Sequence, residues 1–170
     1  RSEIPFEVIG FSEIDKSIIE FYQKNHSGIH NYGDITKINP NKIQNFDLFT
    51  GGFPCQPFSQ VGLGQGEDDT RGTLFHDIIR ICKVKRPKHI LLENVKGLKT
   101  IKHARTLKTI ISSLTRLGYD VVSEIINSKD YDIPQNRERV WIYAYHGVLP
   151  LTFKLSPKPK KLKISFKDLL

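Results

Sequence analysis

A cysteine in a loop of restricted conformation is the residue of this chain best suited to covalent chemistry. Cys55 stands between Pro54 and Gln56, shortly after an apolar run (FDLFT, residues 46–50) that is typical of a buried strand and that two glycines then end. A cysteine in this context lies in a stiff loop past the strand rather than in the apolar core. Its thiolate can act as a nucleophile. The residues alone leave a loop cysteine without a chemical role equally open.

Two further segments place charged groups where they can act on a bound molecule. Glu93 ends a short apolar run at residues 89–92, where a carboxylate is costly unless it is hydrogen-bonded or protonated. Arg137 and Arg139 stand two residues apart as the last apolar run begins, so they project to one face and can offer planar donor groups to a carbonyl or a phosphate. Taken singly, a strand-end glutamate facing water and a salt-bridged strand edge also explain them.

The apolar segments predict the elements that position these groups. We expect strands at residues 6–11, 46–50, 89–92, 121–126 and 140–145, and helices around residues 18–22, 74–82 and 107–117, with Gly118 ending the last helix. This alternation predicts an α/β fold with a doubly wound, mostly parallel sheet. Ligands bind at the carboxyl ends of strands in such sheets, and Glu13, residues 51–59 and Glu93 follow three predicted strand ends.

The composition suits one soluble domain with a polyanionic partner. The chain has 170 residues, of which 38% are hydrophobic and 26% charged, and its net charge is +8 with a pI near 9.5. It contains no apolar run of the ~20 residues that span a bilayer and no signal-peptide pattern, so we expect a cytoplasmic protein. We also expect Cys55 and Cys82 to be reduced and no metal to be bound, since no Cys/His spacing resembles a zinc site.

Five segments in this order resemble the cytosine-5 DNA methyltransferase family, including bacterial restriction–modification enzymes. They are GDIT (residues 33–36), PCQ (54–56), TRGTLF (70–75), ENV (93–95) and QNRERV (135–140). The resemblance runs from about residue 10 to residue 145. It implies a Rossmann-like methyltransferase catalytic domain over residues 1–150, followed by a basic linker at 151–170 that leads towards a target-recognition region. A basic approach to DNA phosphates is the alternative for that linker.

The resemblance also implies how the three segments act together on cytosine. Cys55 would add to C6 of a cytosine flipped out of the DNA duplex and so make C5 nucleophilic. Glu93 would hydrogen-bond or protonate N3, Arg139 would hold the O2 carbonyl and position Glu93, and Arg137 would lie near the phosphate and the thiolate. The base that removes the C5 proton is not revealed by the sequence, and a water is one option.

By the same resemblance, the methyl donor is S-adenosyl-L-methionine, which becomes S-adenosyl-L-homocysteine. Glu13 would bind the ribose hydroxyls, and Ile14 would contact the adenine where the family often has an aromatic residue. The remaining cofactor-binding residues would be Asp34, Ile35, Pro54 and Leu74. Double-stranded DNA would be bound by Gln56, Ser59, Gln60 and Arg71, and the loop at 60–71 would close over the flipped base.

Two parts of the family pattern have no counterpart in the sequence. The glycine-rich turn after the first strand is absent, so we expect the sheet to lack a central strand, which a longer N-terminus or a second polypeptide would supply. The recognition domain is also absent. Three alternatives remain at this point: methylation of cytosine in transfer RNA, a non-catalytic DNA-binding relative, and a dinucleotide-dependent dehydrogenase, for which no G-x-G-x-x-G turn is visible.

Overall fold

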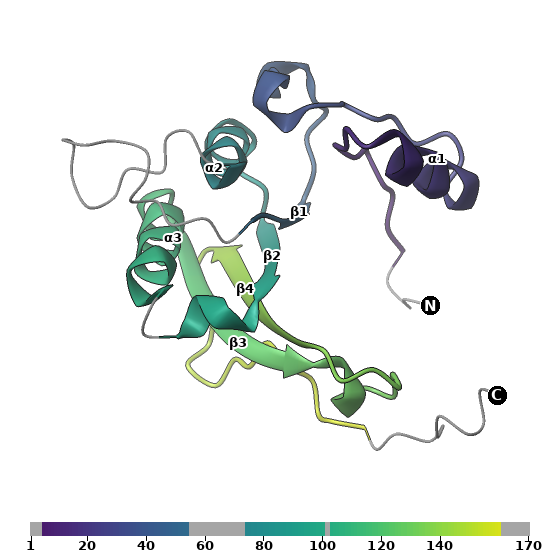
Figure 1. Cartoon of the computed structure of the whole chain (residues 1–170). Coiled ribbons are helices and arrows are strands. Elements are labelled where there is room, and N and C mark those ends of the chain that lie inside the picture. The colour runs from purple at the N-terminus through teal and green to yellow at the C-terminus, as the bar shows by residue number, and fades with distance from the viewer. Residues whose placement is uncertain (1–4, 55–73, 101–102, 161–170) are drawn as a thin grey trace. The chain divides into compact units, whose positions relative to one another are not determined.

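The computed structural model describes residues 5–54, 74–100 and 103–160 (Figure 1). The chain divides into two compact units, residues 1–46 and residues 47–170, which we call the N-terminal unit and the sheet unit. None of the helices in the described ranges is long and apolar enough to cross a membrane.

The N-terminal unit contains one α-helix and two short 3-10 helices. Helix α1 spans Lys16–Asn25 and begins at Asp15, whose carboxylate accepts hydrogen bonds from the first free backbone N–H groups. The 3-10 helices span Ile35–Lys37 and Pro40–Lys42. In this unit two loops lie side by side, because the backbone N–H of Tyr32 donates to the carbonyl of Phe11 at 2.7 Å.

The strand predicted at residues 6–11 is not formed. Within the described part of the segment, only Phe11 pairs, through an isolated bridge with Asn31, and Phe6 is 76% exposed. Extended backbone becomes a strand only when a neighbouring strand satisfies its N–H and C=O groups. Among the described residues no strand offers that partner to residues 6–10, so the apolar alternation predicted a strand where the pairing is missing.

The sheet unit is built on four strands in the order β1-β2-β4-β3. They span Leu48–Gly52 (β1), His89–Val95 (β2), Tyr119–Asn127 (β3) and Glu138–His146 (β4). Strands β1 and β2 are parallel, and β4 runs antiparallel to both β2 and β3. Three of the four described strands therefore share one direction, as the sequence predicted, and the reversed strand lies between two of them. The short connection from β3 to β4 permits only antiparallel pairing.

Helices α2 (Leu74–Lys85) and α3 (Ala104–Arg116) belong to one face of this sheet, and their apolar residues form its core. Both were predicted, and α3 is followed by Gly118 with φ of +89°, a left-handed conformation that glycine adopts without strain. The buried positions alternate along β2 and β4, as expected for strands with one face in the core. The fully buried strand residues are Ile90, Leu92, Val140, Ile142 and Ala144.

The other face of the sheet carries the candidate site and is partly covered by the segment at residues 151–160, which we call the strap. Figure 1 shows the strap in yellow, running past β3 and β4. The ring of Phe153 stacks on Tyr143 with 5.3 Å between centroids, and the backbone N–H groups of Leu155 and Ser156 donate to the carboxylate of Glu124. We expected a basic linker from residue 151; up to residue 160 that segment is bound to the sheet.

Candidate active site

The strand register brings Glu93, Arg137 and Arg139 together. Val95 of β2 lies opposite Arg139 of β4. Because Glu93 is two residues before Val95 in β2, its side chain points to the same face of the sheet as that of Arg139. Arg139 Nε donates to Glu93 Oε1 at 2.9 Å, and a guanidinium nitrogen of Arg137 lies 3.7 Å from the same oxygen. The side chains of Glu93 and Arg139 are 32% and 24% exposed. Within the described ranges Oε2 of Glu93 has no hydrogen bond, so this oxygen is open to a bound molecule.

Arg137 is held by the connection between β3 and β4. Its backbone N–H donates to the side-chain oxygen of Asn127 at 3.1 Å, and its carbonyl accepts from the backbone N–H of Ser128 at 3.2 Å. The side chains of Asn127 and Asn136 are joined at 2.7 Å, and the Ser128 hydroxyl donates to the carbonyl of Gln135 at 2.9 Å. These bonds join the first residues of the connection to its last residues, and they fix the backbone position of Arg137.

Asn94 is a buried residue next to the site, to which reasoning from the sequence assigned no role. Its side chain is 2% exposed; the amide nitrogen donates to the carbonyl of Phe53 at 2.9 Å, and the oxygen accepts from the backbone N–H of Val95 at 2.8 Å. Asn94 therefore ties the end of β2 to the backbone just before Pro54-Cys55 in the sequence. The signal was present: an asparagine at a core-facing position must be hydrogen-bonded by something.

Gly52 leaves room next to the candidate acid. It lies opposite Glu93 in the parallel pair β1–β2, and a Cβ atom at Gly52 would stand 3.7 Å from Glu93 Oε2. That is ordinary van der Waals contact, so a side chain here would be tolerated sterically but would cover the free carboxylate oxygen. Gly52, the last residue of β1, therefore keeps one side of Glu93 accessible.

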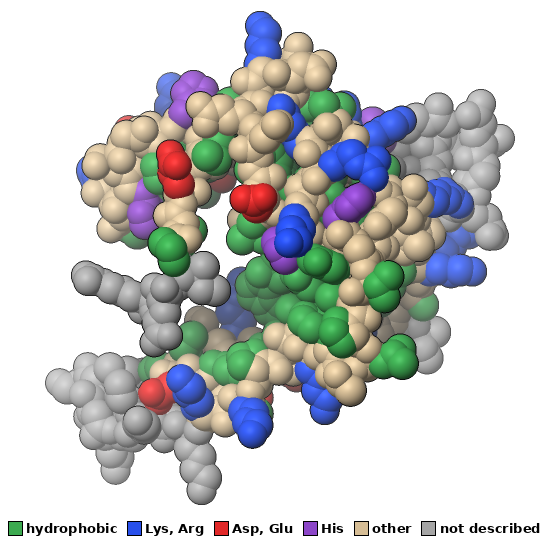
Figure 2. Space-filling view, turned by 180° about the vertical axis from the view of Figure 1, so that it is seen from behind, with side chains coloured by type: hydrophobic (Ala, Val, Ile, Leu, Met, Phe, Trp, Pro, Cys, Tyr) green, Lys and Arg blue, Asp and Glu red, His purple; other side chains and the backbone are tan. Residues whose placement is uncertain are grey.

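A cavity of about 570 Å³ contains the three charged groups. Apart from Ser128, the other side chains of its wall are aliphatic or aromatic, so the charged groups line a largely apolar cavity. Figure 2 shows hydrophobic side chains gathered on the sheet unit, with lysine and arginine side chains around them. The lining residues are Leu91, Glu93, Ile126, Ser128, Tyr131, Ile133, Arg137, Arg139, Trp141, Leu155 and Pro157.

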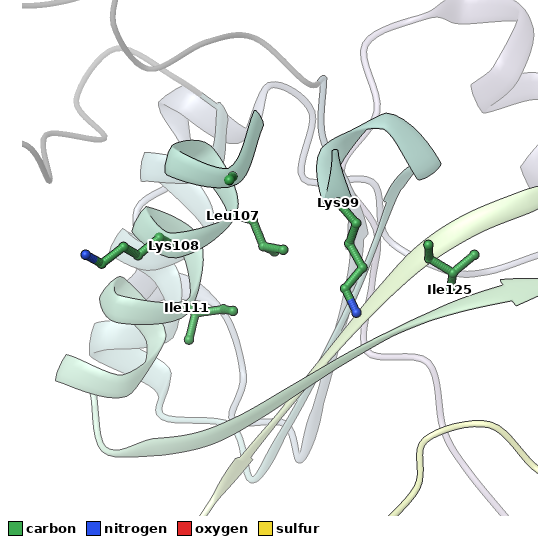
Figure 3. Close-up of a pocket in the computed structure, with 6 residues that line it drawn as sticks. Lys99, Leu107, Lys108, Ile111 and Ile125 are labelled. Atoms are coloured by element: carbon green, nitrogen blue, oxygen red, sulfur yellow. The ribbon is translucent and has the colours of Figure 1, made fainter. Parts of the chain in front are cut away.

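A second cavity, of about 470 Å³, contains no candidate site residue. Leu107 and Ile111 of α3 face Lys99 and Ile125 across it (Figure 3). Lys99 belongs to a 3-10 helix at Lys96–Lys99, and its ammonium group donates to the carbonyl of Ser123 at 2.7 Å. Lys99 is thus bound to the backbone of β3.

In the N-terminal unit, the side chain of Asn31 brings together the turns that carry Glu13 and Asp34. Its oxygen accepts from the backbone N–H groups of Glu13 (3.2 Å) and Gly33 (2.9 Å), and its nitrogen donates to the carbonyl of Glu13 at 3.1 Å. The Ser12 hydroxyl adds a bond to the carbonyl of Gly33. Two candidate cofactor-binding carboxylates therefore start from turns that one amide side chain joins.

The groups around these turns suit a nucleoside. Oε1 of Glu13 accepts from the backbone N–H groups of Ile14 and Asp15, which leaves Oε2 without a partner among the described residues. Ile14 is 71% exposed and offers an apolar surface next to that oxygen. Hydrogen bonds from the side chain and then the backbone of Thr36 hold the pKa of Asp34 below its ordinary value, so Asp34 is an ionised acceptor. Ile35 follows it in the 3-10 helix.

The remaining candidates divide between exposed positions and positions outside the described residues. Pro54 is exposed, and Leu74, the first residue of α2, is 42% exposed. Cys55 and the loop at 60–71 lie outside the described residues, as do the predicted DNA-binding residues Gln56, Ser59, Gln60 and Arg71. In the described ranges no three His, Cys, Asp or Glu side chains lie close enough to hold a metal ion, and the expectation of no metal stays a prediction.

Comparison with known sequences gives matches along almost the whole chain. A family model described as C-5 cytosine-specific DNA methylase matches residues 2–169. The type II methyltransferase M1.ScrFI of Lactococcus lactis subsp. cremoris is 52% identical over 134 residues, which are 79% of this chain and 34% of that protein. The type II methyltransferase M.NlaIV of Neisseria lactamica is 45% identical over 168 residues, 94% of this chain and 40% of that protein. The chain thus spans less than half the length of these relatives.

Solved structures share the fold. DNMT2 of Spodoptera frugiperda aligns with a TM-score of 0.67 at 22% identity, over 96% of this chain and 49% of that one. A putative DNA modification methyltransferase from an E. coli prophage aligns with a TM-score of 0.63 at 23% identity, over 80% of this chain and 39% of that one. The predicted fold class, that of the S-adenosylmethionine-dependent methyltransferases, is confirmed.

Proposed function

Because the chain belongs to the C-5 cytosine-specific DNA methylase family, we propose that it forms the catalytic part of an enzyme that methylates C5 of cytosine in double-stranded DNA. The enzyme would belong to a restriction–modification system and act in the bacterial cytoplasm, where its DNA lies. The observation that carries the proposal is the pairing of Glu93 with Arg139 at 2.9 Å, next to Asn94, which holds the backbone two residues before Cys55.

The described side chains bind one edge of the cytosine ring. Oε2 of Glu93, which has no hydrogen bond within the described ranges, would carry the proton that is donated to N3. Arg139 holds Oε1 through Nε, and since its Nη1 donates to the carbonyl of Glu138 at 2.8 Å, its Nη2 would donate to the O2 carbonyl. Arg137 lies further from Glu93 and is half exposed, which suits contact with a phosphate. These contacts withdraw electrons from the ring when charge develops on N3 and O2.

Cys55 supplies the electrons for the reaction. Its thiolate forms a bond to C6, and the electron pair of the C5–C6 double bond shifts so that C5 becomes nucleophilic and takes the methyl group. A base then removes the proton from C5, the double bond re-forms, and the thiolate leaves. The cytosine must leave the base stack for C6 to be reached, so we propose that the loop at 60–71, with Gln56, Ser59, Gln60 and Arg71, binds the opened duplex.

The N-terminal unit fits the adenosine part of S-adenosyl-L-methionine, which supplies an electrophilic methyl group on a sulfonium. The free oxygen of Glu13 would accept from the ribose hydroxyls, and the exposed Ile14 would cover one face of the adenine. Asp34, an ionised acceptor, would bind the exocyclic amine, with Ile35 beside it. Pro54 and Leu74 of the sheet unit are proposed as further cofactor-binding residues. The product S-adenosyl-L-homocysteine keeps the adenosine and so the same contacts.

The outer edge of β1 supports one further partner. Strand β1 pairs with β2 on one side, has no strand on its other side among the described residues, and leaves Leu48 52% exposed. An open, partly apolar edge is prone to unwanted pairing and is normally covered. We propose that a further strand, from an N-terminal segment or a second polypeptide, pairs with β1 in the active enzyme.

Covalent trapping tests the proposal. DNA containing 5-fluorocytosine carries fluorine where the C5 proton would leave, so the adduct should accumulate with the full-length enzyme and its cofactor. Cys55→Ser should abolish it. Cys82→Ser is the matched control, because burial raises the pKa of the Cys82 thiol to about 12 and keeps it protonated and unreactive. An adduct that survives in Cys55→Ser would refute the assignment, and transfer RNA trapped in place of DNA would refute the substrate.

A further inference from the structure

A single row of residues crosses the sheet at the candidate site. Glu93 lies opposite Gly52 on one side and Trp141 on the other, and Trp141 lies opposite Glu124. Cross-strand neighbours project to the same face, so the indole of Trp141 stands between two carboxylates, the candidate acid Glu93 and Glu124. Glu124 is thus part of the same surface as the site, two strands away from Glu93.

Glu124 has a different task from Glu93, since both of its oxygens are occupied by the strap. Oε1 accepts from the backbone N–H of Leu155 at 2.7 Å and Oε2 from that of Ser156 at 3.1 Å. A hydrogen bond from the Ser156 side chain and then these two backbone bonds hold the pKa of Glu124 below its ordinary value, so the carboxylate is charged and its bonds are of the strong, charge-assisted kind. Glu124 grips the middle of the strap by its backbone.

Contacts on both sides of Glu124 fix the direction of the strap. Before it, Phe153 stacks on Tyr143; after it, the Tyr131 hydroxyl donates to the carbonyl of Pro157 at 3.2 Å, and Lys160 donates to the carbonyl of Asp130 at 2.7 Å. The segment is therefore fastened at four places to β3, β4 and their connection. That many fixed points are unusual for a run of lysines and prolines, which would otherwise be solvated.

The strap completes the wall of the cavity that holds the charged groups. Leu155 and Pro157 line it together with Glu93, Arg137 and Arg139. An apolar wall beside an ion pair excludes water, strengthens the hydrogen bonds within it and fixes its rotamers. Without the Glu124 bonds, Leu155 has no hydrogen bond to the sheet among the described contacts, and this wall would open to solvent.

We propose that Glu124 is a positioning residue: through the strap it keeps Leu155 and Pro157 against the cavity and so holds Glu93 and Arg139 in their reactive geometry. The inference rests on the proposed function, because the reaction that is positioned is the attack on cytosine. It assigns the strap a task separate from the recognition of DNA, and it predicts that loosening the strap slows the chemical step more than it weakens binding.

Two readouts on the full-length enzyme test this. The first is the rate of adduct formation on 5-fluorocytosine DNA at saturating DNA and cofactor, with the DNA Kd measured separately. The second is acrylamide quenching of Trp141, the single tryptophan of this sequence, taken as the difference from Trp141→Phe. The variants are Glu124→Gln, Glu124→Ala and Phe153→Ala, since the last loosens the strap without touching Glu124.

Asp120→Asn is the matched control. Asp120 stands on the same strand and face as Glu124 and also accepts from a backbone N–H, that of Leu149 at 3.0 Å, but Leu149 does not line the cavity. Asp120→Asn thus removes the carboxylate from a hydrogen bond of the same kind, but at Leu149, a residue that precedes the strap. Any effect of strand stability alone should therefore appear in it too.

The proposal expects the rate to fall about tenfold in Glu124→Ala and Phe153→Ala and about threefold in Glu124→Gln, because small displacements of reacting groups cost large factors in rate. Trp141 should become more accessible to acrylamide in the same order, with the DNA Kd within about twofold of wild type, and with Asp120→Asn unchanged in both readouts. Equal rates in wild type and Glu124 variants, or an equal loss in Asp120→Asn, would overturn it. If wild type itself forms no adduct, the proposed function fails, and this inference with it.

Discussion

Two groups of candidate site residues, one in each unit of the chain, are held in place by different means. In the sheet unit, Glu93 and Arg139 meet because their strands are paired in one register, and the ion pair follows from the backbone. In the N-terminal unit, Glu13 and Asp34 stand on turns that the side chain of Asn31 joins. The residues that would activate the cytosine thus depend on strand pairing. Those that would bind the cofactor depend on a few side-chain hydrogen bonds. Single substitutions should separate the two.

The largest effect is expected from a change at Glu93, in the sheet unit. Glu93→Gln keeps the shape but cannot give a proton to N3 or pair with Arg139 as an anion, so adduct formation should fall by about 10²–10⁴-fold, the range for loss of an acid–base group. Stability should change little because the pair is partly exposed. Single-turnover trapping measures the rate and thermal melting the stability. Glu138→Gln, which removes the exposed ion pair with Lys96, is the control; a comparable loss in it would show that the effect is not specific to Glu93.

Asn94→Ala should come next and should affect stability as well as rate. It leaves the carbonyl of Phe53 without its hydrogen bond in the core, at a cost of about 1–3 kcal/mol in the free energy of unfolding. The backbone before Cys55 loses its tie to β2, so trapping should slow too. Denaturant unfolding gives the first quantity and trapping the second. Full-rate trapping in Asn94→Ala would mean that this tie does not position the cysteine loop.

In the N-terminal unit, Asn31→Ala should weaken cofactor binding by about tenfold, since each lost hydrogen bond to the turns contributes about 0.5–1.5 kcal/mol. Isothermal titration with S-adenosyl-L-homocysteine measures the Kd, and the trapping rate at saturating cofactor should stay within about threefold of wild type. Asn25→Ala is the control, because Asn25 is exposed and bonds only to the carbonyl of Phe21 among the described contacts. If Asn31→Ala slows trapping at saturating cofactor as much as Glu93→Gln does, the two groups of residues do not act independently.

The smallest effect is expected from lowering the pH, which protonates Glu124. The pKa of Glu124 is lowered from 4.5, first by the hydrogen bond to Ser156, so its contribution to holding the strap is complete above about pH 4.5 and is lost as the pH falls through the lowered value. Acrylamide quenching of Trp141 should therefore rise only below about pH 4.5, and Glu124→Gln should remove that step. A step near neutral pH in place of this one would assign the change to another group.

The sequence predicted which charged residues lie together better than it predicted the strand pairing. Glu93, Arg137 and Arg139 were expected to act together because their segments resemble the methyltransferase family, and the structure places the three side chains next to one another. The reversal of β4 follows from the short connection between β3 and β4, whereas the apolar periodicity used to predict the strands carries no information on their direction. The strand predicted at residues 6–11 required a partner strand, a non-local property. The strap was unpredictable because its bonds to Glu124 use backbone N–H groups, which every non-proline residue has.

The structure of the trapped complex tests the central claim most directly. A crystal structure of the full-length enzyme bound to 5-fluorocytosine DNA and cofactor should show a bond from Cys55 to C6. Glu93 should lie within about 2.6–3.2 Å of N3 and Arg139 should face O2. A cytosine whose N3 and O2 face other residues, with neither Glu93 nor Arg139 in contact with the base, would contradict the account.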